Sequence, residues 1–206
     1  MEFIVSSTEL LQHLNAVKGV INSKNTLPIL DNYLFNLDGN TLSITASDLE
    51  TTLNTQISLS NANGSGLIAI EAKRLTDILK EFSEQPLTFK INESNYQVDI
   101  ITQNGKFSIP CQSGVEYPKL PIIDEANTTS VTLPSEIFLK GINCTIFATS
   151  DDELRPVMTG ILIEFKKEHF RMVSTDSHKL VRYTRTDIIP SKEDAVILPK
   201  KSATIL

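Results

Sequence analysis

The amino-acid sequence repeats itself at a fixed offset of 128 residues, and this repeat constrains the fold more than any other feature. Residues 26–52 align without a gap with residues 154–180, so that Pro28 falls on Pro156 and Asp48 falls on Asp176. Apolar positions coincide with apolar positions along the whole stretch, and the register continues on both sides of it. A period of this length predicts two copies of one globular domain and excludes a short-period solenoid.

The repeat also sets the domain boundaries. We place the first domain at residues 1–120, a linker at 121–128 and the second domain at 129–206, because residues 113–128 carry Pro118 and Pro121 without any periodicity. The last residue, Leu206, aligns with the middle of a helix of the first copy, and nothing matches that copy from Leu79 onward. The second domain is therefore expected to be truncated, in a fragment of a longer protein.

Composition narrows the class of protein. A chain of 206 residues with 40% hydrophobic side chains can bury two ordinary cores, so neither a disulfide nor a metal is needed for stability. Cys111 and Cys144 form no close-spaced pair, which is typical of reduced thiols in the cytosol. The first ten residues are too polar for a signal peptide, and no apolar run reaches ~20 residues, so no membrane partner is expected.

Charge argues against a protein that simply coats nucleic acid. The net charge is -6, divided into -7 for residues 1–128 and +1 for residues 129–206. Because phosphate binding needs clustered Lys and Arg side chains, any contact with DNA has to come from a local basic stripe.

Periodicity predicts an α+β fold with helices packed on one face of antiparallel sheets. Ser6 and Glu9 form a capping-box pattern before a helix whose apolar face holds Leu10, Leu14 and Val17. In the first copy we expect strands at 2–5, 33–37, 42–44, 49–59, 66–71, 87–92, 96–102 and 106–111, and a second helix at 72–82. In the second copy we expect a strand at 130–133, a helix at 134–148, the repeated strands, and a helix that begins near residue 200.

One cluster invites an enzymatic interpretation. Asp176, Ser177 and His178 are the residue types of a hydrolase triad, but consecutive residues point in different directions, whereas a triad needs convergent side chains. No Gly-x-Ser-x-Gly elbow is present. A turn capped by the Asp, or a binding role, is favoured over catalysis, and a small hydrolase remains the rival hypothesis.

Two sets of charged residues can be interpreted either as solvent-exposed surface or as a functional site. The acidic loop 151–153 lacks the spaced oxygen ligands of a calcium site, so no metal is predicted there. Lys73, Lys80, Lys200 and Lys201 lie on equivalent helices of the two copies. They form either a solvated face or a surface that meets one phosphate backbone.

Five motifs together resemble the bacterial DNA sliding clamp family, the beta subunit of DNA polymerase III. They are TLPIL at 26–30, SDLE at 47–50, EYPKLP at 116–121, LRPVMTG at 154–160 and TDSHKL at 175–180. The resemblance covers the whole chain in register. It implies duplicated DNA-clamp domains, each with two helices packed on antiparallel sheets, and a third domain absent from this chain.

The resemblance also implies a non-enzymatic function. Such a processivity factor encircles duplex DNA as a head-to-tail homodimeric ring and binds the DNA without regard to sequence. It tethers the polymerase III alpha subunit, the clamp loader, other polymerases and repair proteins, in the bacterial cytoplasm at the nucleoid. No cofactor is implied, and an unrelated duplicated binding module is the remaining alternative.

Site residues follow from the resemblance residue by residue. The implied DNA contacts are Lys24, Lys73, Lys80, Arg155, Lys200 and Lys201. The implied cleft for partner peptides, which carry a Gln and large apolar residues, consists of Val157, Met158, Thr175, Ser177, His178, Lys179 and Leu180. The implied dimer interface has Arg74, Ile78, Phe107 and Ile109. For Met158 and Leu180 the alternative is an ordinary place in the core.

Overall fold

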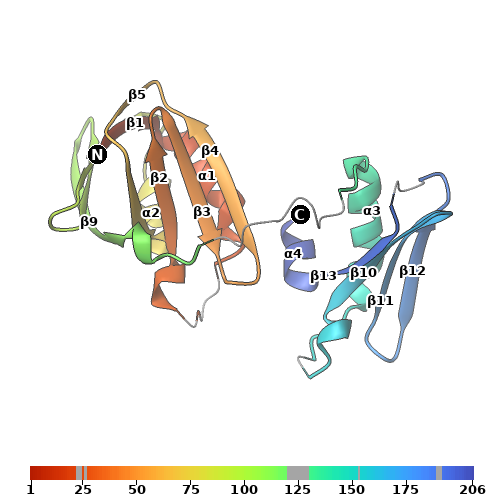
Figure 1. Cartoon of the computed structure of the whole chain (residues 1–206). Helices are drawn as coiled ribbons and strands as arrows, with labels where there is room; N and C mark the ends of the chain where they lie inside the picture. Colours follow the sequence, from red (N-terminus) through yellow and green to blue (C-terminus); the bar gives the residue numbers. More distant parts are fainter. Residues whose placement is uncertain (22–24, 26, 120–129, 153, 189–191) are drawn as a thin grey trace. The chain divides into compact units, whose positions relative to one another are not determined.

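A computed structural model describes residues 1–21, 25, 27–119, 130–152, 154–188 and 192–206. The chain divides into two compact units, Met1–Leu120 and Pro121–Leu206 (Figure 1). The predicted linker at 121–128 lies outside the described residues, as does Lys24.

Unit one is a nine-stranded antiparallel sheet system backed by two helices. Its strands follow the spatial order β4-β3-β2-β6-β9-β8-β7-β1-β5. Its elements are β1 (Glu2–Ser6), α1 (Ser7–Lys18), η1 (Pro28–Asp31), β2 (Asn32–Asp38), β3 (Thr41–Ser47), β4 (Thr52–Ser58), β5 (Asn61–Asn63), β6 (Gly66–Glu71), α2 (Ala72–Lys80), β7 (Pro86–Asn92), β8 (Gln97–Thr102), β9 (Gly105–Ser113) and η2 (Gly114–Glu116).

Apolar burial fixes how the helices of unit one lie. Helix α1 packs on β3, β4 and α2, and helix α2 packs on β2 and β6, so both helices cover the same side of these strands (Figure 1). The predicted apolar face of α1 is confirmed, because Leu10, Leu14 and Val17 are all buried. Phe3 of β1 and Phe89 of β7 are also buried and stack with ring centroids 4.9 Å apart. The α+β class with helices on antiparallel sheets is thus confirmed.

Unit two repeats these elements at the offset seen in the sequence. It contains α3 (Ser135–Thr145), η4 (Ile146–Ala148), η5 (Pro156–Met158), β10 (Gly160–Lys166), β11 (His169–Thr175), β12 (Leu180–Arg185), β13 (Asp194–Pro199) and α4 (Lys200–Ile205). Both α helices and all four strands begin 128 residues after α1, β2, β3, β4, β6 and α2. The sheet order is β12-β11-β10-β13, and α3 and α4 pack on it (Figure 1). None of the described helices is long and apolar enough to cross a membrane.

The predicted capping box at the start of α1 is wrong. The Ser6 side chain makes no capping hydrogen bond and instead lies 2.9 Å from the Thr8 hydroxyl. The neighbouring hydroxyl, that of Ser7, donates to the Ser83 carbonyl and accepts from the Gln85 amide. Tertiary contacts with the segment before β7 therefore replace local capping at this helix.

The predicted strand at 130–133 is also wrong, because these residues have no regular secondary structure. Its counterpart β1 is a strand because it pairs with both β5 and β7. Strands form where a neighbouring strand supplies ladder hydrogen bonds, and the counterpart of β5 falls at 189–191, outside the described residues.

The segment after β9 belongs to unit one, not to the start of a linker. Gly114 begins η2, which turns the chain so that Tyr117 is buried against Leu30 and Ala69. The Tyr117 hydroxyl donates to the Asn32 carbonyl at 3.5 Å, and burial raises the pKa of Tyr117 to about 12. The aromatic ring thereby closes the end of this core.

This closure makes Gly114 sensitive to substitution. A Cβ atom there would lie 2.7 Å from the Leu67 carbonyl carbon and 2.8 Å from the Ile68 amide nitrogen, neither of which can rotate away. We expect Gly114→Ala to lower the free energy of unfolding of unit one by about 1–3 kcal/mol. Gly105→Ala is the matched control, since a Cβ at Gly105 meets nothing within 4 Å. Equal urea midpoints for the two variants would contradict the close approach.

Candidate partner-binding site

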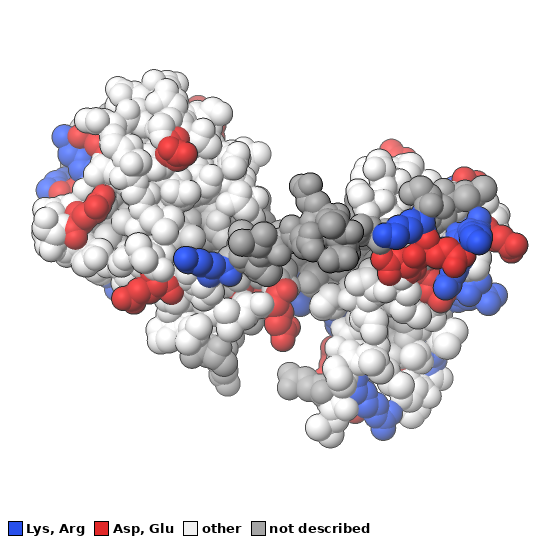
Figure 2. Space-filling view, in the orientation of Figure 1, with Lys and Arg blue, Asp and Glu red and all other residues white. Residues whose placement is uncertain are grey.

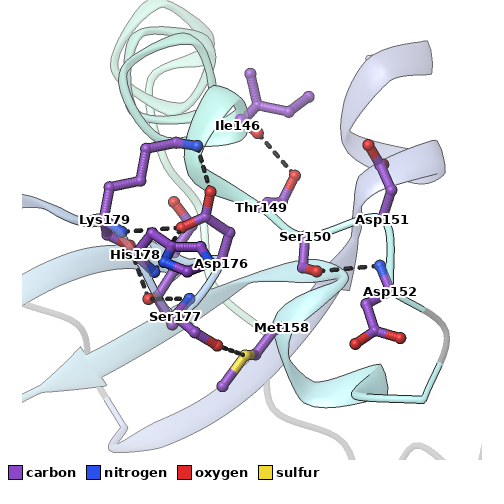
Figure 3. A network of polar contacts seen from close by, with 12 residues as sticks. Ile146, Thr149, Ser150, Asp151, Asp152, Met158, Asp176, Ser177, His178 and Lys179 are labelled. Atoms are coloured by element: carbon purple, nitrogen blue, oxygen red, sulfur yellow. Dashed lines mark hydrogen bonds and ion pairs between the residues drawn. The ribbon is translucent and has the colours of Figure 1, made fainter.

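The motif TDSHKL forms the tight turn that joins β11 to β12. The Asp176 carboxylate accepts hydrogen bonds from the backbone N–H groups of His178 (3.0 Å) and Lys179 (2.9 Å) (Figure 3). The Thr175 hydroxyl accepts from the Ser177 amide at 3.2 Å and donates to the Lys179 carbonyl at 2.7 Å. Ser177 itself has φ 78°, a left-handed conformation that few non-glycine residues adopt.

Unit one contains the same turn between β3 and β4. The Asp48 carboxylate accepts from the amides of Glu50 (3.0 Å) and Thr51 (2.6 Å), and the Ser47 hydroxyl accepts from the Leu49 amide at 3.2 Å. Leu49 has φ 78°, as Ser177 does. The capping Asp expected from the sequence is therefore structural in both copies.

The 3₁₀ helix η5 brings Met158 against the turn of unit two. The Ser177 hydroxyl donates to the Met158 sulfur at 3.4 Å (Figure 3). It also accepts from Arg155 Nη1 at 2.7 Å. The Ser150 amide also donates to the Met158 carbonyl at 2.9 Å. Segments far apart in sequence thus meet at Met158 and Ser177, as the cleft prediction requires.

The two copies differ in what they expose at this turn. Leu180, the first residue of β12, is 67% exposed, and its counterpart in unit one is the polar Thr52. Met158 is half-buried, whereas its counterpart Leu30 is fully covered by unit one itself. Val157 is also 67% exposed. The core alternative for Leu180 is wrong within unit two as the structure describes it.

Charge at the turn is locally neutralised. Lys179 Nζ pairs with Asp176 Oδ2, and this contact, together with the two backbone N–H groups, holds the pKa of Asp176 well below its usual range. Arg155 Nε lies 3.5 Å from Asp152 Oδ2. The surface is therefore apolar, with charged groups that are paired around it.

The hydrolase hypothesis finds no support in the contacts of this turn. Among the described residues, the partners of the Ser177 hydroxyl are Arg155 and Met158, and neither is a general base. The Asp176 carboxylate binds the backbone of His178 and not its ring. A nucleophile needs a base within hydrogen-bond reach, which itself is oriented by a third group.

The basic residues expected at DNA lie on helices or beside the turn. Lys73 is exposed on α2, and Lys80 pairs with Asp77 at 3.3 Å on the same helix. In α4, Lys200 pairs with Asp151 at 2.5 Å, and Lys201 is half-buried. Arg155 lies with the cleft residues. In the view of Figure 2, the face formed by β2, β3 and β4 carries few charged side chains.

The residues expected at a dimer interface lie on β9 and on α2. Phe107 is 42% exposed and meets Phe82 edge-on with centroids 5.4 Å apart, whereas Ile109 is buried within unit one. On α2, Arg74 pairs with Glu71 at 3.2 Å and Ile78 is half-buried. Of these four residues, Ile109 is placed to support the surface and not to form it.

Sequence reasoning missed the contribution of Asp152. Its carboxylate accepts from the Leu154 amide at 3.0 Å and pairs with Arg155, so it fixes the loop that carries the guanidinium. The spacing of three residues between Asp152 and Arg155 is a sequence signal that could have indicated this ion pair. Of the described residues, no three His, Cys, Asp or Glu side chains gather as metal ligands would.

Two successive copies of an antiparallel sheet backed by two helices, the second with an exposed apolar turn, define a duplicated clamp-type protein. The family described as DNA polymerase III beta subunit, N-terminal domain, matches residues 1–121, and its central domain matches residues 132–206. The chain therefore belongs to the DNA polymerase III beta subunit family.

Individual relatives agree with this assignment. The chain is 30% identical over 204 residues to the beta sliding clamp of Haemophilus influenzae, which covers 98% of this chain and 54% of that protein. The crystal structure of the DNA polymerase III subunit beta from Pseudomonas aeruginosa superimposes with a TM-score of 0.90 at 26% identity, over 100% of this chain and 55% of that one. A further solved Pseudomonas aeruginosa clamp is bound to griselimycin (TM-score 0.85, 27% identity, 100% and 55% covered). The chain spans about half the length of these relatives.

The Asp176 carboxylate makes the turn sensitive to acid. Because its pKa is lower in the folded chain than the ~3.9 of an unfolded Asp, its contribution to stability is fully present above pH ~4 and is lost as pH falls below that value. We expect hydrogen exchange at the His178 and Lys179 amides, corrected for intrinsic rates, to accelerate as pH falls through this window. Asp176→Asn, which cannot titrate, should show no such pH dependence, and identical profiles would contradict the assignment.

Proposed function

We propose that this chain forms part of a DNA sliding clamp, a non-enzymatic processivity factor that tethers partner proteins to duplex DNA through the turn of unit two. The family assignment supports this function, and the whole ring requires more than the part of the relatives that this chain spans. Such a protein acts at the nucleoid in the bacterial cytoplasm.

One observation carries the proposal. The backbone of the turn has the same positive-φ residue and Asp cap in both units, but the exposed apolar side chains differ: unit one exposes Leu49 and Leu27, whereas unit two exposes Leu180 and Val157 beside a half-buried Met158. Unit one shows that the turn does not need these side chains to form. Exposed apolar groups that the fold does not require mark an interaction surface.

A short peptide fits this surface. The partners implied by the family resemblance are the polymerase III alpha subunit, the clamp loader, other polymerases and repair proteins, each with a Gln and large apolar residues in its binding segment. An apolar anchor placed against Met158 and Leu180 would remove both from water, which is the main source of affinity in such pockets. His178 and Lys179, both exposed, are placed to contact the polar part of the peptide.

Topological linkage explains how an acidic chain acts on DNA. A ring needs only enough positive charge to remain centred on the duplex, so the exposed Lys73 and the lysines of α4 suffice as a sparse inner lining. Lys24, Lys80 and Arg155 complete the proposed set of DNA contacts. Contacts to phosphates alone carry no sequence information and preserve sliding.

Ring closure as a homodimer is proposed to use one edge of β9. Residues 105–110 pair with β8, and no strand pairs with their other side within the part of the chain that the structure describes. Such an edge, with Phe107 exposed on it, is suited to strand addition by a partner subunit. Arg74 and Ile78 are proposed to contact the same partner, supported by Ile109.

The substitution Leu180→Thr tests the peptide-binding surface, because it gives the turn of unit two the residue type that unit one has at the same position. We expect Leu180→Thr to weaken binding of a fluorescent peptide with one Gln and two large apolar residues by about tenfold, because an apolar contact of ~1–2 kcal/mol is lost. Fluorescence anisotropy on the present chain measures the effect.

A matched pair of valines provides the control. Val157 and Val196 are 67% and 54% exposed in the same unit, but Val157 lies beside Met158 and Val196 lies on β13. Val157→Thr should weaken the peptide and Val196→Thr should leave it unchanged. Equal effects would show that the peptide binds any exposed apolar side chain.

Lysine substitutions test the DNA-facing surface. We expect Lys73→Ala to lower the low-salt affinity for duplex DNA of any sequence and to reduce the slope of log K against log salt by about one. Lys90→Ala is the control, because Lys90 is also an exposed lysine of unit one but lies on β7, paired with Glu2 at 3.2 Å. The same loss in both variants would point to net charge instead of a helix-borne stripe.

A further inference from the structure

Strand β5 ends at an asparagine that is followed by a glycine, Asn63–Gly64, and both residues are exposed. In such a pair the backbone nitrogen of the glycine can attack the side-chain amide carbon of the asparagine. The glycine carries no Cβ atom that would obstruct this approach. The sequence holds one other pair of this kind, Asn104–Gly105, in the turn between β8 and β9. The surroundings of the two pairs therefore decide which of them reacts.

Few contacts hold the Asn63–Gly64 pair in place. Strand β5 is the outermost strand of its sheet, and its pairing with β1 ends at Asn63 and Glu2. Gly64 lies beyond this last pair, with φ 83°. Within the part of the chain that the structure describes, the Asn63 side chain has no hydrogen-bond partner. The terminal pair can therefore open, and the Gly64 nitrogen can approach the Asn63 side chain, without the loss of any side-chain contact.

A tight turn constrains the Asn104–Gly105 pair. Thr102 and Gly105 are paired across the two residues of this turn. The Asn104 backbone N–H donates to Thr102 Oγ1 at 3.2 Å, and the Thr102 hydroxyl donates to the Gly105 carbonyl at 3.1 Å. Ring closure at Asn104 has to rotate the peptide group that precedes Gly105, which breaks these contacts. The fold thus protects Asn104 and leaves Asn63 open to attack.

We propose that Asn63 is a site of spontaneous deamidation, and that the carboxylate it gains loosens β5 from β1. The Gly64 nitrogen loses its proton and bonds to the Asn63 side-chain carbon, the bond from that carbon to the amide nitrogen of the side chain breaks, and ammonia leaves. Water then adds to the cyclic imide and opens it at either carbonyl. The product is aspartate, or an isoaspartate in which the backbone runs through the former side chain.

The strand neighbours of Asn63 make a carboxylate unfavourable there. Asn63 pairs with Glu2 of β1, which pairs in turn with Lys90 of β7. Glu2 Oε1 lies 3.2 Å from Lys90 Nζ, so the cation of this row already has a partner. Like charges directly opposite each other in antiparallel strands are destabilising, and isoaspartate also lengthens the backbone by a methylene group. Loss of β5 would uncover an edge of β1, and uncovered strand edges pair with other chains.

Ageing of the purified chain at mildly alkaline pH tests the site. Peptide mapping by mass spectrometry should show deamidation at Asn63 about tenfold faster than at Asn104, because hydrogen bonds of ordinary strength must break before Asn104 reacts. Asn61, which Ala62 follows on the same strand, is the matched control and should stay unmodified. In urea that unfolds the chain, the two Asn-Gly pairs should react at similar rates. Equal rates at Asn63 and Asn104 in the folded chain overturn the assignment.

Substitutions at Asn63 test the effect on β5 separately. Asn63→Asp should accelerate hydrogen exchange at the β1–β5 amides by about threefold at low salt relative to Asn63→Gln, which keeps a neutral amide. In a Glu2→Gln background the two variants should exchange alike, because the opposing carboxylate is gone. Aged wild-type chain should approach the exchange of Asn63→Asp, and aged Asn63→Gln should not change. Unaltered exchange in Asn63→Asp overturns the loosening of β5.

Discussion

Each unit depends on burying one face of an antiparallel sheet under two helices. In unit one this places Leu10 and Leu14 of α1 and Leu75 and Leu79 of α2 in the core, and in unit two Ile142 and Ala203 play the same part. Burial of a Leu or Ile side chain contributes about 1.5–3 kcal/mol relative to exposure, more than a typical surface ion pair. The sheet register follows from this requirement, because a slip of one residue would turn the buried side chains to the other face.

Because the core dictates the backbone, the two copies share even their strained residue. The turns after β3 and β11 are both capped by an Asp carboxylate and both hold a non-glycine residue at φ 78°. Function then depends on side chains outside the core, which can differ between the two copies. Leucines at three positions of unit one are replaced by Arg155, Met158 and Ser177 in unit two, where the Ser177 hydroxyl accepts a hydrogen bond from Arg155.

Electrostatics plays a different part in each proposed interaction. At the turn, paired charges surround an apolar surface, so the proposed peptide binding depends on apolar burial and not on a long-range field. On the helices, sparse lysines in an acidic chain are compatible with DNA because a ring retains DNA by topology. Neither interaction requires the strong positive charge of a protein that coats nucleic acid.

The sequence by itself determined the duplication, the α+β class and nearly all strand and helix positions, because apolar periodicity reflects burial that is local to each element. It also indicated the capping role of Asp176, since an Asx turn depends on residues two and three positions away. Tertiary structure decided the features that depend on contacts between residues far apart in the sequence. It replaced the cap of Ser6 by contacts of Ser7 with residues 83 and 85, left residues 130–133 without regular secondary structure, and brought Arg155 to Ser177. Spacing along the chain cannot specify such contacts, because they form between segments that only the packed core brings together.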